Sequence, residues 1–214
     1  MSDQDLVYLT IAEASALIAS KSLSPVELAE AVFRRIEATD GRLNSYNRLM
    51  RASAMAEARA AEQRAAAGTL IGPLDGIPLG VKDLYDTAGV ITTGGTGAYR
   101  QRVPAQDATT VRLLRQAGAV ILGKTNTHEL ALGGTTNNAH YGPSRNPWNT
   151  DRVPGGSSGG SGSAVAAGQA LGAMGTDTGG SIRIPSAFCG ITGHKPSHGL
   201  VGRGGILPLS LTLD

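Results

Sequence analysis

The sequence predicts an α/β protein in which helices flank a mostly buried β-sheet. Three observations support this fold class. The first seventy residues show helical periodicity, short apolar runs typical of buried strands occur at 79–81 and 119–122, and a helical pattern lies between them over 108–117. Strands that alternate with helices are typical of layered α/β domains. We therefore divide the chain into an N-terminal helical segment, residues 1–70, and an α/β core, residues 71–214.

Capping signals delimit the first helices. The stretch TIAE at 10–13 has the capping-box pattern, and apolar residues follow it at helical spacing. The Ser-Pro pair at 24–25 begins a second helix, because serine caps helix N-termini and proline fits the first helical position. We expect this helix to end before Gly41. A third, alanine-rich helix covers about 50–67 and ends at Gly68.

The core begins with the strand at 79–81. The helix over 108–117 follows, closed by Gly118, and leads into the strand at 119–122. Beyond residue 133 loops dominate, with helices expected near 161–170 and 182–188. The apolar positions of the helix over 108–117 are Val111, Leu113 and Leu114.

Composition excludes several function classes. The 19 basic and 17 acidic residues give a net charge of +2, which offers no electrostatic reason to bind nucleic acid or a membrane surface. No apolar run is long enough to span a bilayer. The only cysteine, Cys189, cannot form an internal disulfide, and its apolar neighbours predict an inert core residue. A reducing, cytoplasmic setting is therefore expected, with no metal site and no cofactor.

The stretch PGGSSGGSGSAVAAG, residues 154–168, joins a Gly/Ser run to an apolar helix. One interpretation is a flexible linker, although too little chain follows it to build a second core. Another is an anion-binding loop at a helix N-terminus, although the Gly-Lys-Ser/Thr of phosphate loops is absent. A third interpretation assigns chemistry to hydroxyls that glycine leaves accessible, namely those of Ser157, Ser158 and Ser181.

The second Gly-rich stretch, GTDTGGS at 175–181, predicts an oxyanion hole. Thr178, Gly179, Gly180 and Ser181 present consecutive backbone N–H groups with little side chain above them, as donors to a developing negative charge require. Ser181 could then attack a carbonyl, provided that a base is near.

Lys82 is our candidate for that base. None of the four histidines lies in a recognisable Ser-His-Asp motif. Lys82 ends the apolar strand LGVK, where burial would lower its pKa. The alternative is a surface lysine that extends from the strand end into water.

Four segments together resemble the amidase signature family. They are GVKDLYDT (80–87), RNPWNTDRVPGGSSGGSGSAVAAG (145–168), GTDTGGSIRIPSAFCGITGHKPS (175–197) and GRGGILPLSLTLD (202–214). The spacings of 75 positions from Lys82 to Ser157 and 24 from Ser157 to Ser181 also agree with the family pattern. The resemblance implies a mixed β-sheet core flanked by helices, of which only the first part is present, and makes residues 71–214 the catalytic core.

The resemblance also implies a Ser–cis-Ser–Lys triad. Ser181 would be the nucleophile, Ser157 the bridging serine after a cis peptide bond from Gly156, and Lys82 the base. The oxyanion-hole amides would be those of Thr178, Gly179, Gly180 and Ser181. Lesser roles would fall to Ser158 as a helper of the triad, Asp177 in orienting the nucleophile loop, Arg183 in steadying it or binding substrate, and Ala131 as a substrate contact.

These features predict a hydrolase of linear amides, with esters or carbamates also open as substrates, acting through an acyl-enzyme on Ser181. One alternative within the family is the A subunit of an aminoacyl-tRNA amidotransferase, which frees ammonia from glutamine and needs partner subunits. Alternatives of other classes are a phosphate-binding transferase that uses the Gly-Ser loop and a non-catalytic fragment. The partner would be a small molecule, a homodimer is left open, and more of the same protein is expected after Asp214. The family pattern is broken at His194, where an apolar residue is usual, so local packing is expected to differ.

Overall fold

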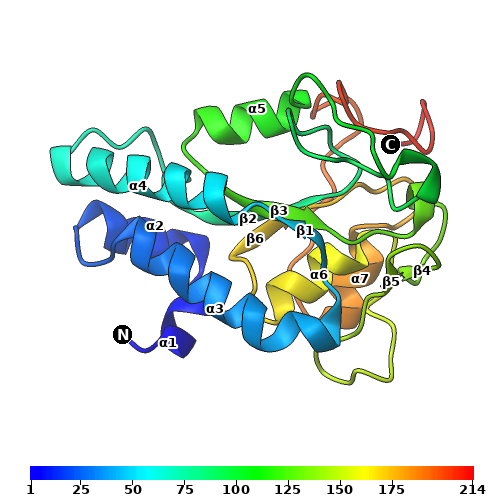
Figure 1. The fold of residues 1–214 in the computed structure, drawn as a ribbon, viewed down its shortest axis with the longest axis horizontal. Helices are drawn as coiled ribbons and strands as arrows, with labels where there is room; N and C mark the ends of the chain where they lie inside the picture. The colour runs from blue at the N-terminus through cyan, green and yellow to red at the C-terminus, as the bar shows by residue number, and fades with distance from the viewer.

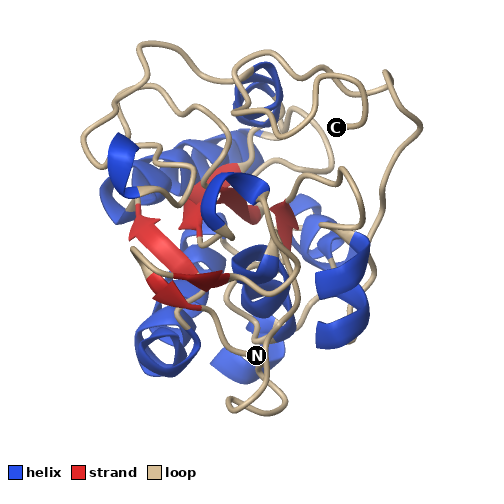
Figure 2. Ribbon diagram, turned by 90° about the vertical axis from the view of Figure 1, so that its right-hand side faces the viewer, coloured by secondary structure: helices blue, strands red, loops and turns tan.

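A four-stranded mixed sheet forms the centre of the protein, which we describe from a computed structural model covering residues 1–214 (Figures 1 and 2). The strand order is β1 (Tyr46–Leu49), β3 (Val120–Thr125), β2 (Pro78–Lys82) and β6 (Gly172–Met174). β1 is antiparallel to β3, whereas β2 is parallel to both β3 and β6. The α/β fold class and the two strands expected at 79–81 and 119–122 are confirmed.

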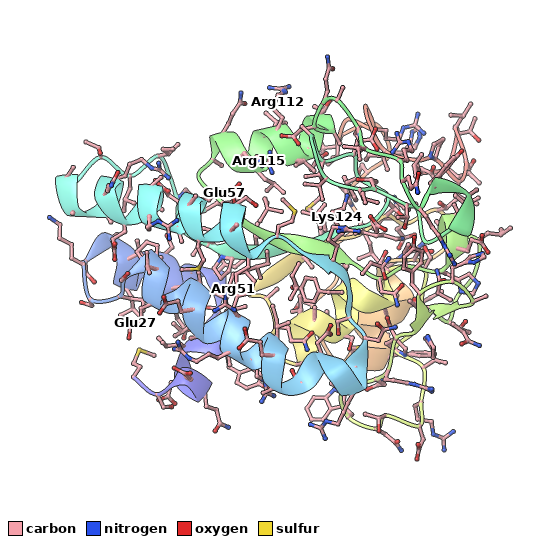
Figure 3. The ribbon with its side chains drawn as sticks, viewed as in Figure 1. Glu27, Arg51, Glu57, Arg112, Arg115 and Lys124 are labelled. Carbon is pink, nitrogen blue, oxygen red and sulfur yellow. The ribbon has the colours of Figure 1, made fainter.

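Helices cover both faces of the sheet. In Figure 1, α4 and α5 lie above the strands, and α3 and α6 lie below them. Glu57 of α4 accepts a hydrogen bond from the backbone N–H of Ile121 at 2.8 Å and lies 3.4 Å from Arg115 of α5 (Figure 3). The helices are α1 (Asp3–Val7), α2 (Ile11–Ala19), α3 (Pro25–Leu43), α4 (Arg51–Ala67), α5 (Thr109–Gln116), α6 (Gly159–Ala166) and α7 (Arg183–Cys189). Two 3₁₀ turns, η1 (Gly97–Tyr99) and η2 (Glu129–Ala131), and a short hairpin of β4 (Asn137–Asn138) and β5 (Gly142–Pro143) complete the chain.

The capping signals of the N-terminal helices are confirmed. Thr10 and Glu13 form a reciprocal capping box at the start of α2, and the Ser24 side chain caps α3. The end expected for α3 is wrong. The helix continues through Gly41, where a Cβ would meet no atom within 4 Å, and ends at Leu43, followed by the C-cap Asn44 in the left-handed conformation. A solvent-facing glycine lowers helix stability but does not stop a helix whose other face is packed.

Three further features differ from what the sequence predicts, and contacts with distant segments explain the differences. Leu113, expected on the apolar face of its helix, is 52% exposed, while its neighbour Val111 is buried. α6 begins at Gly159 and ends at Ala166, rather than near 161–170, because its glycine-rich first turn packs against other backbone segments. β1 lies within the segment expected to be helical and forms one edge of the sheet. Such short strands exist because a partner strand supplies their hydrogen bonds.

β6 forms the other edge of the sheet. It pairs with β2 through Leu79–Val81 and has no strand on its second side, and its three residues are only half-buried. The hydrophobic core draws on residues from Leu6 to Ala170, so the N-terminal helices and the sheet share one core. No helix combines the length and apolar character needed to cross a membrane.

Candidate active site

The central strand β2 delivers Lys82 to the interior. All five residues of β2 are buried, and Lys82, at its carboxyl end, has no exposed surface. Its Nζ lies 2.7 Å from Ser157 Oγ and 2.8 Å from Thr176 Oγ1. The alternative of a surface lysine is therefore excluded, and the structure brings the predicted base and the predicted bridging serine into direct contact.

Burial changes the acidity of this amine. Desolvation lowers the pKa of Lys82 to about 7, and the more distant carboxylates of Asp177 and Asp214 oppose part of this effect. The two contacts of Nζ are hydroxyl groups, and no carboxylate lies within ion-pair distance of it. A substantial fraction of Lys82 is therefore neutral near pH 7, as a proton acceptor must be.

Backbone contacts hold Ser157 in place. The Gly156–Ser157 peptide bond is cis, as the family resemblance implies. The carbonyl oxygen of Ser157 accepts hydrogen bonds from the His128 N–H and from Thr127 Oγ1, both at 3.0 Å. Thr136 Oγ1 donates a further bond to it at 3.3 Å. Both threonine hydroxyls also face a second carbonyl, that of His128 for Thr127 and that of Gly155 for Thr136. These contacts fix the backbone of Ser157, whose side chain meets Lys82 Nζ.

Close backbone packing explains the glycines of this loop. A Cβ on Gly160 would lie 2.5 Å from the backbone N and O of Asn126 and from the carbonyl oxygen of Ser45. A Cβ on Gly156 would lie within 2.8 Å of backbone atoms of Gly134 and its two successors. The segment is therefore a packed loop at the start of α6 and not a flexible linker.

The predicted nucleophile, Ser181, lies just before α7 and is 9% exposed. The backbone N–H groups of Thr178, Gly179, Gly180 and Ser181 donate to no acceptor in the chain. They are thus free to bind an external oxygen. The carbonyl of Ser181 accepts a hydrogen bond from the Ser158 N–H at 3.2 Å. The Ser181 hydroxyl makes no hydrogen bond within the chain, to Ser157 or to any other residue.

Asp177 organises the loop that carries Ser181. Its carboxylate accepts bonds from the backbone N–H groups of Ile182 and Arg183, at 3.1 and 3.2 Å, and pairs with the Arg183 guanidinium through two bonds of 2.9 and 3.0 Å. Burial alone would raise the pKa of Asp177, but these hydrogen bonds lower it to about 2. The carboxylate stays ionised and closes the turn around Ser181. Arg183 is engaged in this pair, with its side chain 56% exposed.

Ser158 connects the two Gly-rich loops. Its hydroxyl donates to the Thr176 carbonyl at 3.2 Å and accepts from the Thr176 N–H at 3.3 Å. Ala131 lies in η2, three residues after His128, and is buried with a positive φ of 62°. No hydrogen bond joins it to Lys82, Ser157 or Ser181, and the substrate contact stays a prediction.

A large cavity lies beside this site. It has a volume of about 1140 Å³ and borders Ser158, Thr176 and Asp177, but none of the three predicted catalytic residues lines it. Its walls include β6, α7 and the segment after Ile191, in which His194 is exposed. Cys189 is fully buried, with a pKa raised to about 12 by desolvation, in keeping with the inert residue expected.

Sequence reasoning missed two residues of the site. Thr176 supplies the second contact of Lys82, and it stands in the same GTDTGGS motif as Ser181. Tyr85, in the motif that contains Lys82, donates its hydroxyl to the Gly175 carbonyl at 2.6 Å. The only signal in the sequence was that both residues stand inside the motifs of the site. This signal was weak, because threonine and tyrosine also make purely structural contacts.

Comparison with known proteins shows which family the chain resembles. A family model described as Amidase matches residues 27–214. The A subunit of the glutamyl-tRNA(Gln) amidotransferase of Anaeromyxobacter dehalogenans is 48% identical over 99% of this chain and 43% of its own length. The chain thus spans less than half the length of this curated relative.

Solved structures show the same similarity. A protein described as an amidase superposes with a TM-score of 0.89 at 45% identity, over 94% of this chain and 46% of its own. The native peptide amidase of Stenotrophomonas maltophilia does so with a TM-score of 0.88 at 41% identity, over 94% and 42%. The fold, the family match and these relatives agree, and the chain belongs to the amidase signature family.

Proposed function

We propose that this chain carries the catalytic machinery for cleaving the C–N bond of an amide through an acyl-enzyme on Ser181. The observation that carries the proposal is the fully buried Lys82, in contact with Ser157 Oγ at 2.7 Å and without a carboxylate partner. Beside it, four consecutive N–H groups that end at Ser181 have no acceptor in the chain. A neutral base, a relay hydroxyl and oxyanion donors are the parts that acyl transfer needs.

The proposed reaction begins with proton transfer. Neutral Lys82 accepts the proton of the Ser157 hydroxyl as Ser157 takes that of Ser181, and Ser181 Oγ forms a bond to the substrate carbonyl carbon. The N–H groups of Thr178–Ser181 hold the resulting oxyanion. When the C–N bond breaks, the proton returns through Ser157 to the departing amine. Water then attacks the ester by the same relay, releasing a carboxylic acid and restoring the Ser181 hydroxyl.

For the substrate, the curated relatives favour the alternative within the family over the stand-alone hydrolase. We propose a primary carboxamide, glutamine foremost, from which the enzyme releases ammonia as the A subunit of an amidotransferase that works with partner subunits. The curated relative with this name is 48% identical to the chain. A stand-alone amidase is the second candidate, supported by solved amidases of 41–45% identity.

The phosphate-binding alternative finds little support in the Gly-Ser loop. The N–H groups at its helix start are already used: that of Ser158 donates to Ser181, that of Gly159 to Thr136 and that of Gly160 to Asn126. A phosphate would need these donors to be free.

A labelling experiment with a carboxamide panel tests the proposal. Attack of Ser181 on a fluorophosphonate–biotin probe forms an O–P bond and expels fluoride, so intact mass and peptide mapping report the modified residue. We expect labelling at Ser181 in the parent and none in Ser181→Ala. Ammonia release is then measured with glutamine, acetamide and a peptide amide, and preference for glutamine would support the amidotransferase function. Labelling elsewhere, or no labelling, refutes the proposed nucleophile.

A further inference from the structure

A second buried lysine lies on the opposite face of the sheet from Lys82. Lys124 of β3 pairs in register with Val81, whereas Lys82 pairs with Thr125, and side chains alternate between faces along a strand. Lys124 has no exposed surface, and Figure 3 shows it inside the molecule at the level of the sheet. The proposed reaction does not use it, yet burying an ammonium group is costly unless it is well paired.

The contacts of Lys124 all belong to residues 83–92, the stretch directly after β2, which we call the turn after β2. Its Nζ donates to the Tyr85 carbonyl, to Thr92 Oγ1 at 2.8 Å and to Thr87 Oγ1 at 3.1 Å, and lies 3.7 Å from Asp83 Oδ1. This environment differs from that of Lys82, whose two contacts are hydroxyls. A carboxylate together with three oxygen acceptors satisfies a charged ammonium group.

Asp83 is itself buried and held from other sides. Only 1% of its surface is exposed, and it accepts bonds from the Thr93 backbone N–H, from Thr93 Oγ1 and from the Asn47 amide at 3.2 Å. Asp83 directly follows Lys82, so a pair between Asp83 and Lys124 holds the chain at the point where β2 ends. The other charged groups near Lys124 are Asp86 and Arg102, which pair with each other at 2.6 Å.

Tyr85 connects this turn to the base. Its backbone N–H donates to the Lys82 carbonyl at 3.0 Å, and its carbonyl is the acceptor for Lys124. Its hydroxyl donates to Gly175 at 2.6 Å, and the next residue, Thr176, contacts Lys82 Nζ. Tyr85 is 3% exposed, so the ring has little freedom to move independently of its backbone.

We propose that Lys124 and Asp83 are positioning residues for the catalytic base, acting through Tyr85 on Gly175 and Thr176. The pair holds the turn after β2 so that the Tyr85 hydroxyl keeps Thr176 against Lys82 Nζ and keeps water out of that contact. Loss of the pair loosens Thr176, admits water and restores part of the ordinary basicity of Lys82. The role of Lys82 as the base rests on the proposed function, whereas the contacts of Lys124, Tyr85 and Thr176 do not depend on it.

The test follows the titration of Lys82 directly. The chain has four lysines, so lysine-selective ¹³C/¹⁵N labelling gives four side-chain signals, assigned by single substitutions. We expect Tyr85→Phe and Lys124→Met each to raise the pKa of Lys82 by about one unit, and the double variant to raise it no further. Lys21→Met, which changes an exposed lysine, is the matched control and should leave it unchanged. The charged groups nearest Lys82, Asp177 and Asp214, are the same in all variants.

Rates of fluorophosphonate labelling give a second readout. A rise of one unit from a pKa of about 7 lowers the neutral fraction at pH 7 about fivefold, and labelling should slow in proportion. If Lys124→Met does not fold, Tyr85→Phe still removes the connecting hydroxyl and decides the question. An unchanged Lys82 titration in folded Tyr85→Phe, or additive shifts in the double variant, overturns the proposal. Failure of the parent to react with the probe would refute the proposed function, while the titration would still test the positioning role.

Discussion

Replacing Lys82 with methionine tests whether Lys82 is the base. Methionine has a similar length and fills the same buried space, but it cannot accept a proton. The variant removes the contacts of Nζ with Ser157 Oγ at 2.7 Å and Thr176 Oγ1 at 2.8 Å, and leaves Ser181 and the oxyanion donors in place. If Lys82 is the base, the loss is therefore confined to proton transfer.

The structure sets the size of the effect. A pKa of about 7 leaves about half of Lys82 neutral at pH 7, whereas an ordinary lysine would be neutral in only about one molecule in 2500. The neutral fraction rises from about 10% at pH 6 to about 90% at pH 8, so the parent should react about ninefold faster at pH 8. Removing a general base lowers a rate by about 10²–10⁴-fold.

The assay is the rate of fluorophosphonate labelling between pH 5.5 and 9.5, followed by intact mass for the parent, Lys82→Met and Lys21→Met. We expect a rising profile with a midpoint near pH 7 in the parent and in the Lys21→Met control. Lys82→Met should be slow and lack this midpoint. Parental rates in Lys82→Met would refute the assignment of the base, and a parental midpoint above pH 9 would refute the argument from burial.

Four further predictions concern folding stability and the labelling rate. Lys82→Met should be more stable than the parent at pH 7, by up to about 4 kcal/mol, because the unfolded parent binds more protons than the folded parent between the folded pKa of about 7 and the unfolded pKa of 10.5. Denaturant unfolding of both proteins measures this difference, and a difference that does not shrink toward pH 10.5 contradicts the prediction. Asp177→Asn should remove about 2 kcal/mol of stability that the parent has above pH 4 and loses toward pH 2. Acid unfolding curves measure this, and equal stability of the variant and the parent at pH 6 would contradict it. Gly160→Ala should destabilise the protein by more than about 2 kcal/mol, since the new Cβ would meet backbone atoms at 2.5 Å, whereas Gly41→Ala, in open space on α3, should stabilise it by about 0.5–1 kcal/mol. Similar shifts in melting temperature for the two variants would show that backbone packing is not the cause. Ser157→Ala should slow labelling at Ser181 by at least about 100-fold without changing stability by more than about 1 kcal/mol, and rapid labelling would argue against the relay.

Local signals predicted the helices more reliably than the strands. The capping box at Thr10 and the Ser-Pro start of α3 are decided by neighbouring residues, and both appear in the structure. β1 and β6 went unpredicted because their few residues become strands only through hydrogen bonds from β3 and β2. The overrun of α3 past Gly41 has a similar cause, since packing of the opposite face outweighs the weak helix propensity of one glycine.

For the site, the sequence by itself determined which groups are present: a lysine at the end of an apolar strand, two serines in Gly-rich loops at family spacing, and an acidic residue before the second serine. Only the tertiary structure decided that Lys82 is completely buried, that it contacts Thr176 as well as Ser157, and that a second buried lysine lies across the sheet. The reason is physical. The acidity of an amine depends on the water and charges around it, and those are set by segments 75 to 94 residues away in the chain.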